Sequence, residues 1–301
     1  MSSSAEAAPG ADIRSPPPAD SLPVLRDELD GLDDRMLDLL IQRATVVERV
    51  AAAKRGVAPL RPGREAAILR RLLGQHQGTL PRSAIIRIWR EIFASSIAQQ
   101  QSMQVAVCDP AMDGRFLAAA REHLGALTPM RVYRGPAQAI GEVVDGRASV
   151  AILPLPGEST GEASGPGWWP GLLQHNASGR IHVVARLPFW ANRPEGAPSV
   201  AALMVANAAA DPSGHDISLL ALEVEAQLSL GSLSNTITVA GFKAVSILVH
   251  RPAGVQIAQL LVEVEGFVTA DDPRLAQITG LQAPPLIVGA YAIAVSEDSA
   301  V

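Results

Sequence analysis

The sequence predicts a multidomain chain in which an all-α segment of three helices is followed by an α/β segment and then by an α+β segment. Residues 21–102 show helical periodicity and no strand pattern. Residues 103–211 alternate buried strands with helices, which is typical of a parallel sheet. Residues 212–301 follow the β-α-β-β-α-β order of the split ferredoxin-like unit. Residues 1–20, rich in Ser, Ala and Pro and without the apolar core of a secretory signal, are expected to form a disordered tail.

The longest predicted helix covers residues 22–55, with Gly56 positioned to end it. Apolar residues recur along it at steps of three and four, so one stripe of the helix is apolar along its whole length. The stripe consists of Leu25, Leu29, Leu32, Met36, Leu39, Leu40, Val46, Val47 and Val50. At 1.5 Å per residue the helix is about 50 Å long, which is too long for one compact domain to cover. We therefore expect partner helices, some of them from another subunit of an interlocked homodimer.

Two shorter helices are predicted after the long one. The second covers residues 64–77 and has Pro62 near its start, where proline is favoured. The third covers residues 82–103, with an apolar face. That face consists of Ile85, Ile88, Trp89, Ile92, Phe93 and Ile97.

The composition narrows the class of protein. The chain of 301 residues has a net charge of −5, which gives no electrostatic footprint for nucleic acid or an anionic membrane. No apolar run reaches the roughly 18 residues that a membrane-spanning helix requires. The single cysteine, Cys108, fits a reducing compartment, so we expect a cytoplasmic protein. The 6 histidines lack ligand spacing, so no metal site is expected.

Three cations on the long helix are spaced in an informative way. Arg43 and Lys54 lie nearly three turns apart on one face, about 16 Å along the axis, so their long side chains can close on a small dianion from both ends. Arg26 lies about 25 Å before Arg43 and cannot reach the same ligand. It is either an ordinary surface arginine or part of a second site formed with a partner. For any one of these cations alone, a solvated helix charge is the simpler interpretation.

Further polar residues fall on the two shorter helices. Arg64 and Glu65 open the second helix, and Ser96 and Gln100 lie four residues apart on the third, so that they project from one face. Joined with the cations of the long helix, they make a pocket that is rich in positive charge and hydrogen-bond donors and holds one carboxylate. Such a pocket suits a small dicarboxylate that also carries a hydroxyl group.

This pattern resembles the all-helical chorismate mutase family over about 80 residues. The matching positions are Arg26, Arg43, Lys54, Pro62, Arg64, Glu65, Ser96 and Gln100. The resemblance implies an intertwined dimer in which each long helix crosses both active sites. It also implies that Arg43 binds a substrate carboxylate and that Arg26 binds one in the partner's site. Lys54 and Gln100 would donate to the ether oxygen of chorismate, Glu65 would hold the ring hydroxyl, and Arg64 and Ser96 would complete the polar wall.

The implied reaction is the rearrangement of chorismate to prephenate, a unimolecular step without proton transfer. An enzyme accelerates it by holding the reactive conformer and by stabilising the charge that develops on the ether oxygen, so no cofactor is expected. One position departs from the family pattern. Arg61 stands where an acidic residue often precedes the Arg-Glu pair, which leaves the contact to the hydroxyl open.

The remainder resembles bifunctional chorismate mutase–prephenate dehydratases. That resemblance implies a periplasmic-binding-protein-like α/β domain over residues 103–211 and an amino-acid-binding ACT-like domain over residues 212–301. The stretch 132–155 is similar to the dehydratase segment that ends in Leu-Pro-Ile-Glu-Asn-Ser, and 231–252 parallels the two phenylalanine-binding motifs of the ACT domain.

The departures from the dehydratase pattern are larger than the matches. Val200, Ala201 and Ala202 replace the Thr-Arg-Phe motif, and Glu158 and Ser159 are displaced from the Glu-Asn-Ser corner. Alanine can neither bind a carboxylate nor assist a leaving hydroxyl, so we expect an inactive dehydratase-like domain. The ACT-like segment keeps four motif positions, but has Val-His where the family has Glu-Ser. The four are Gly231, Leu233, Arg251 and Pro252. A working bifunctional enzyme and a C-terminal module that senses an aromatic amino acid both stay open as alternatives.

Overall fold

The chain forms two compact units, residues 1–55 and 56–301, which are described separately below. Within the part that is described, no helix is long and apolar enough to cross a membrane. The structure is a computed structural model and describes residues 21–54, 59–157, 167–176, 179, 181–251 and 254–296.

The described part of the first unit is a helix, α1, which is unbroken from Leu22 to Lys54 over 33 residues. Its first turn is closed by a hydrogen bond from the Leu25 amide to the Ser21 carbonyl, at 3.0 Å. The long helix predicted from the sequence is therefore confirmed, while its expected end at Gly56 lies outside the described residues. Most of the large apolar side chains of α1 are 41% to 64% exposed, while Val24 and Val47 are partly buried. The exposed ones are Leu22, Leu25, Leu29, Leu32, Met36, Leu37, Leu39, Leu40, Ile41, Val46 and Val50.

The second unit begins with the two shorter helices, α2 (Pro62–Gln75) and α3 (Arg82–Ala98). Helix α3 ends five residues before the predicted end at Met103. The Gln99 amide still bonds to the carbonyl four residues earlier, and the amides of Gln100 and Gln101 then share the Ile97 carbonyl, so the backbone tightens into a turn.

The predicted apolar face of α3 needs a second correction. Ile88 is 42% exposed and lies off the buried face, which instead includes the charged Arg90. The buried side of α3 packs against α2 and against a segment that follows β4 (His182–Leu187). This core consists of Ala66, Leu69, Leu73, Ile85, Ile86, Phe93, Phe189, Trp190 and Val295.

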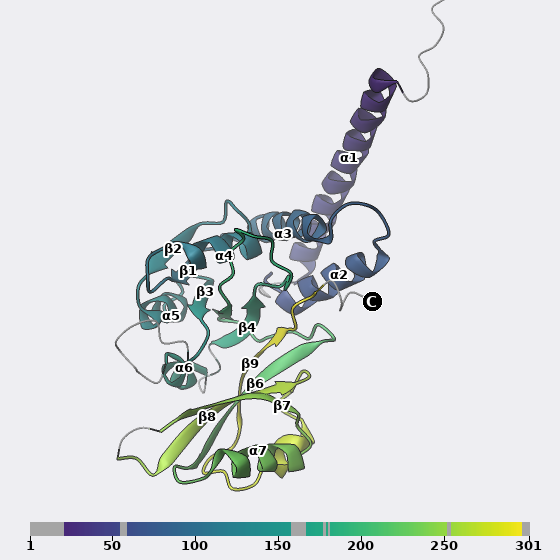
Figure 1. Cartoon of the computed structure of the whole chain (residues 1–301). Coiled ribbons are helices and arrows are strands. Elements are labelled where there is room, and N and C mark those ends of the chain that lie inside the picture. The colour runs from purple at the N-terminus through teal and green to yellow at the C-terminus, as the bar shows by residue number, and fades with distance from the viewer. Residues whose placement is uncertain are drawn as a thin grey trace, which may run out of the picture. The chain divides into compact units, whose positions relative to one another are not determined.

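A mixed sheet follows the helices (Figure 1). Strand β1 pairs in parallel with β2 and β3, which confirms the predicted β-α-β-α-β unit. Strand β5 runs antiparallel to both β3 and β4. The elements are β1 Val105–Cys108, α4 Arg115–Leu124, β2 Met130–Tyr133, α5 Pro136–Val144, β3 Val150–Pro154, α6 Trp169–Asn176, β4 His182–Leu187 and β5 Ala202–Ala206.

The C-terminal segment has the strand order β9-β6-β8-β7 with every neighbouring pair antiparallel, which is the ferredoxin-like arrangement that the sequence predicts. The weakly predicted first helix forms as α7, with the Ser229 hydroxyl accepting from the Ser232 amide as a cap at 3.2 Å. The second is a single 3-10 turn, η1. The elements are β6 Asp216–Glu225, α7 Leu230–Val239, β7 Ala244–His250, β8 Ile257–Glu265, η1 Pro273–Gln277 and β9 Leu286–Ala292.

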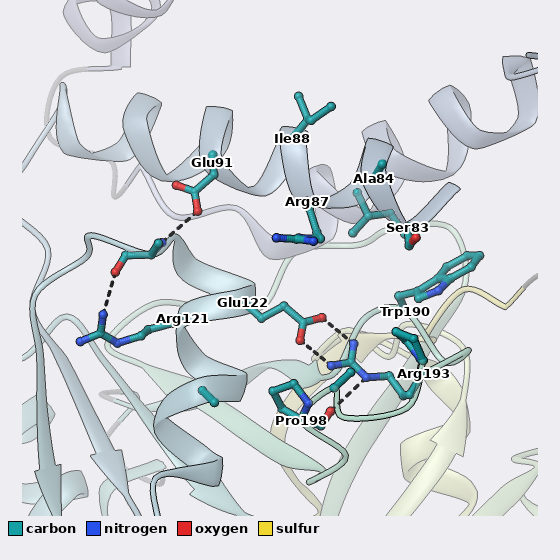
Figure 2. A pocket seen from close by; sticks show the side chains of 15 residues that line it. Ser83, Ala84, Arg87, Ile88, Glu91, Arg121, Glu122, Trp190, Arg193 and Pro198 are labelled. Atoms are coloured by element: carbon teal, nitrogen blue, oxygen red, sulfur yellow. Dashed lines mark hydrogen bonds and ion pairs between the residues drawn. The ribbon is translucent and has the colours of Figure 1, made fainter. Parts of the chain in front are cut away.

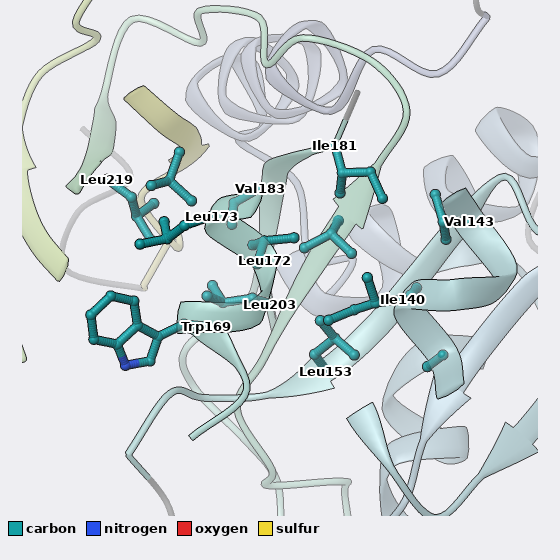
Figure 3. Close-up of a cluster of buried hydrophobic side chains, with 14 of the residues drawn as sticks. Ile140, Val143, Leu153, Trp169, Leu172, Leu173, Ile181, Val183, Leu203 and Leu219 are labelled. Carbon is teal, nitrogen blue, oxygen red and sulfur yellow. The ribbon is translucent and has the colours of Figure 1, made fainter. Parts of the chain in front are cut away.

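The two β segments join into one nine-stranded sheet at β4 and β9. Val183 pairs there with Gly289, and a Cβ at Gly289 would lie 2.1 Å from the Val183 carbonyl oxygen, so only glycine permits this approach. The core beneath the junction draws on α6 and on strands of both segments (Figure 3). Trp169 and Leu172 contribute to it from α6, and Leu219 from β6.

Candidate active site

The first turn of α2 holds Glu65 in an almost buried position. Its Oε2 accepts a hydrogen bond from Arg90 Nη1 of α3 at 2.9 Å, and the two side chains are 14% and 4% exposed. The Arg90 guanidinium also lies 5.2 Å from the centre of the Phe189 ring. Burial raises the pKa of Glu65 to about 7, although Arg90 opposes that rise and the nearby Asp211 adds to it. Glu65 is therefore a carboxyl group that changes charge near neutral pH.

Sequence reasoning missed Arg90 as the partner of Glu65. The signal was present, because Arg90 occupies a core position of α3, in step with Ile86, Phe93 and Ile97. A charged residue at such a position needs a buried partner of opposite charge. No hydrogen bond to the other oxygen of Glu65, Oε1, is present among the described residues.

The N-terminus of α2 is capped by a residue far away in the sequence. Asp211 accepts hydrogen bonds from the Gly63 amide at 2.9 Å and from the Arg64 amide at 3.0 Å. Arg61 Nε donates to the same carboxylate at 3.0 Å. The position that the resemblance left open, Arg61, thus forms an ion pair with Asp211.

Ser96 and Gln100 are brought together, but not as two neighbours on one helix. Gln100 lies in the turn after α3, and its Nε2 donates to the Ser96 carbonyl at 2.8 Å. The Ser96 hydroxyl donates to the carbonyl of Ile92 at 2.6 Å. The prediction that both project from α3 is therefore wrong for Gln100, because the helix ends two residues earlier.

The remaining predicted residues fall on two different elements. The Arg64 side chain is exposed in the first turn of α2, next to Glu65. Arg26, Arg43 and Lys54 all lie on α1, which is one unbroken helix. The rise of a helix then separates Arg26 from Arg43 by about 25 Å and Arg43 from Lys54 by about 16 Å along the axis. Whether these cations close one site with α2 and α3 stays a prediction.

A cavity of about 750 Å³ lies between α3, α4 and residues 190–198, and none of the predicted site residues lines it (Figure 2). Arg87 and Glu91 point from α3 towards α4, where a carboxylate from Glu122 pairs with Arg193. The cavity thus lies beside the mutase-like helices on a different face from Ser96.

The dehydratase-like positions carry little reactive chemistry. Ala202 is buried in β5 between Pro154 and Leu187, and the preceding Val200 and Ala201 are partly buried. The displaced Glu158 and Ser159 lie outside the described residues. No group at positions 200–202 can therefore bind a carboxylate through its side chain.

The ACT-like positions are partly engaged within the chain itself. Arg251 donates from Nε to the Ala226 carbonyl at 2.9 Å and from Nη2 to the Leu228 carbonyl at 3.0 Å. Leu233 is buried on α7, and His250 packs edge-on against Trp169 with ring centres 6.3 Å apart. Pro252 lies outside the described residues.

The helices α1, α2 and α3 carry a polar, cation-rich residue set, and an α/β and ferredoxin-like extension follows them in the chain. Residues 25–101 match the chorismate mutase type II family, so the helical segment is a domain of this type, as the sequence predicts. A bifunctional chorismate mutase/prephenate dehydratase of Stutzerimonas stutzeri is 32% identical over 151 residues, covering 48% of this chain and 41% of that protein. Its counterpart in Pseudomonas aeruginosa is 33% identical over 153 residues, covering 47% and 40%.

These matches span about two fifths of the length of the curated relatives. Among solved structures, one described as GqqA, a novel type of quorum quenching acylases, aligns with a TM-score of 0.48 and 17% identity over 64% of this chain and 95% of that chain. Prephenate dehydratase from Streptococcus mutans aligns with a TM-score of 0.45 and 16% identity, over 64% and 98%.

Proposed function

We propose that the chain catalyses the rearrangement of chorismate to prephenate in aromatic amino acid biosynthesis. The observation that carries the proposal is the match of residues 25–101 to the chorismate mutase type II family, together with the polar residues at the matching positions. Arg43 and Lys54 on α1 supply cations for a dianion, and the first turn of α2 adds Arg64 and Glu65. The reaction then needs no nucleophile or cofactor, only orientation and stabilised charge.

Each residue has a role that its chemistry allows. Arg43 pairs with a carboxylate of chorismate, while Lys54 and Gln100 donate to the ether oxygen as the bond to carbon breaks. Glu65 keeps Arg90 on one oxygen and offers Oε1 to the ring hydroxyl. The amide of Gln100 has two N–H groups, so one can serve the ligand while the other bonds to the Ser96 carbonyl.

The site is shared between two copies of the chain in an intertwined homodimer. Support comes from α1, because every residue of its apolar stripe except Val47 is exposed, and burying such side chains is the main favourable term in association. Arg26 is too far along α1 from Arg43 to bind the same ligand, so it serves the partner's site. The dimer is cytoplasmic, which suits a chain whose single cysteine is buried and free.

The direct experiment measures the disappearance of chorismate and the formation of prephenate by the purified full chain without added metal or cofactor. We expect saturable turnover that survives a chelator. If chorismate is not consumed above the uncatalysed rate, the proposed function is wrong.

The extension has no dehydratase activity in this proposal. The absence of a hydroxyl or cation at Val200, Ala201 and Ala202 supports this, because leaving-group assistance needs both a proton donor and carboxylate binding. Prephenate offered as substrate should yield no phenylpyruvate in an ultraviolet assay. Formation of phenylpyruvate would instead favour the bifunctional alternative.

A regulatory role of the ferredoxin-like segment is a second proposal. The order β9-β6-β8-β7 and the ACT-like positions Gly231, Leu233 and Arg251 support binding of an aromatic amino acid. Isothermal titration calorimetry with phenylalanine, tyrosine and tryptophan tests it. Heat of binding with one of them supports a sensing module, and none with any of the three contradicts it.

A further inference from the structure

The first turn of α2 lacks a capping side chain of its own. Arg61 occupies the N-cap position and makes no side-chain capping bond, and Pro62 has no N–H group to satisfy. The Glu65 amide bonds to the Arg61 carbonyl at 2.9 Å. The amides of Gly63 and Arg64 are therefore the two whose partners must come from elsewhere.

Asp211, in the connection between β5 and β6, supplies both partners. Its side chain is only 9% exposed, and its two oxygens divide the contacts, Oδ1 to the Gly63 amide and Oδ2 to the Arg64 amide and Arg61 Nε. A carboxylate is the preferred group at this end of a helix, where the amide dipoles concentrate positive charge.

The backbones of α2 and of the β5–β6 connection also lie in close contact at Gly63 and Asp211. A Cβ at Gly63 would lie 2.0 Å from the Asp211 carbonyl oxygen, so no other residue allows α2 to approach the connection this closely. About two helical turns further on, Arg70 also contacts this connection. It donates from Nη1 to the Ser213 hydroxyl at 2.8 Å and from Nη2 to the Ile293 carbonyl at 2.7 Å.

We propose that Asp211 is a positioning residue for the mutase site: from the extension, it sets the orientation of the α2 turn that carries Arg64 and Glu65, and so makes mutase activity depend on the extension. This inference rests on the function proposed above. Asp211 touches no substrate and acts through the backbone of α2 and through its charge.

The charge of Asp211 gives a readout that a purely structural cap would lack. Glu65 is faced by Arg90 from α3, by Asp211 from the β5–β6 connection and, across Asp211, by Arg61. Asp211 is one cause of the raised pKa of Glu65, after burial. Replacing Asp211 with asparagine removes that negative charge but keeps an oxygen acceptor of the same size, so the pKa of Glu65 should fall.

The experiment compares full-length wild type with Asp211→Asn and Asp211→Ala, and uses Asp145→Asn as a matched control. Asp145 is an exposed carboxylate of the extension that pairs with Arg147 at 2.7 Å, away from α2. We measure kcat and KM for chorismate between pH 5 and 9, together with circular dichroism and thermal unfolding. The alanine variant should lose about tenfold in kcat/KM and the asparagine variant about threefold, because the free energy of the lost cap lowers the population of the correctly placed α2 turn.

The pH profile separates positioning from plain stabilisation. In Asp211→Asn the rise of KM with pH should begin at lower pH than in wild type, while Asp145→Asn keeps the wild-type profile. Folded Asp211 variants with wild-type kcat/KM and an unshifted profile would overturn the inference, even if they unfold at lower temperature. If Asp211→Ala does not fold, Asp211→Asn decides alone. Turnover of chorismate by wild type is measured first. If wild type has no activity, the proposed function fails, and this outcome is distinct from a failure of the role given to Asp211.

Discussion

Helices α1 and α2 carry predicted binding residues of the same kind but in opposite surroundings. Helix α2 is held by its own chain: its apolar side packs against Phe189 and Val295, and Asp211 caps its start. Helix α1 exposes the apolar side chains along its length, Leu39 by 64%. The exposed apolar side chains of α1 are what the proposed homodimer would bury, whereas the contacts of α2 with the extension are made within the same chain.

The largest expected effect is on the cations of α1. Arg43→Ala and Lys54→Ala should each reduce kcat/KM for chorismate by at least about a hundredfold, because each removes a charged donor from the transition state. Steady-state kinetics measures this, with Arg35→Ala as the control, since it removes an arginine of the same helix from outside the predicted site. Wild-type turnover by both variants would show that the site lies elsewhere.

The next effect concerns the exposed stripe of α1. Leu39→Asp should convert the dimer into monomers and abolish activity, because it places a charge in the middle of an apolar interface. Light scattering coupled to size exclusion reports the mass. Gln42→Asp adds the same charge to an exposed polar position of α1 and should leave the dimer intact. A wild-type chain that is monomeric at micromolar concentration would contradict the shared site.

The tie between α2 and the C-terminal strands should appear in stability. Arg70→Ala removes four hydrogen bonds, two to Ser213 and one each to the carbonyls of His215 and Ile293, so it should lower the free energy of unfolding by about 2–3 kcal/mol. Arg71→Ala, one residue along, removes a single exposed contact to Gln75 and should cost less than about 0.5 kcal/mol. Urea denaturation measures the free energy of unfolding of both variants. Equal decreases in that free energy would show that the contacts of Arg70 with the C-terminal strands do not stabilise the fold.

A smaller effect concerns pH. Because the pKa of Glu65 is raised to about 7, this group is neutral below that value and adds a negative charge to the anion site above it. Its raised pKa also means that the folded state binds the proton more tightly than the unfolded one, so stability falls as pH rises from about 4.5 to 7. Because the negative charge of Glu65 repels the anionic substrate, KM for chorismate should increase roughly fivefold between pH 6 and 8.5.

Glu65→Gln is the control for the pH effect, since it keeps the hydrogen-bonding shape without the charge. Its KM should vary little over the same range. A wild-type KM that is flat with pH, or a Glu65→Gln variant with the wild-type profile, would show that Glu65 is not the group that titrates.

The sequence was sufficient for features that repeat locally. Periodicity located α1, the parallel β1–β3 unit and the ferredoxin-like strand order, since each depends on which side chains a single element must bury. It did not give Asp211 as the cap of α2, and although the core position of Arg90 signals a buried partner, it did not identify that partner as Glu65. These contacts join residues 148 and 25 positions apart, and their geometry exists only after folding. The sequence also did not predict the early end of α3, because the polar residues after Ala98 include no helix breaker such as Gly or Pro.

The shared site is tested most directly by mixing two inactive variants, Arg26→Ala and Arg43→Ala. If each site takes Arg43 from one subunit and Arg26 from its partner, a mixed dimer has one site with both arginines and one with neither. After subunit exchange in an equal mixture, about one quarter of wild-type activity should return. If both arginines instead serve the same subunit's site, every site in the mixture lacks one of them and no activity returns, which would contradict the intertwined dimer.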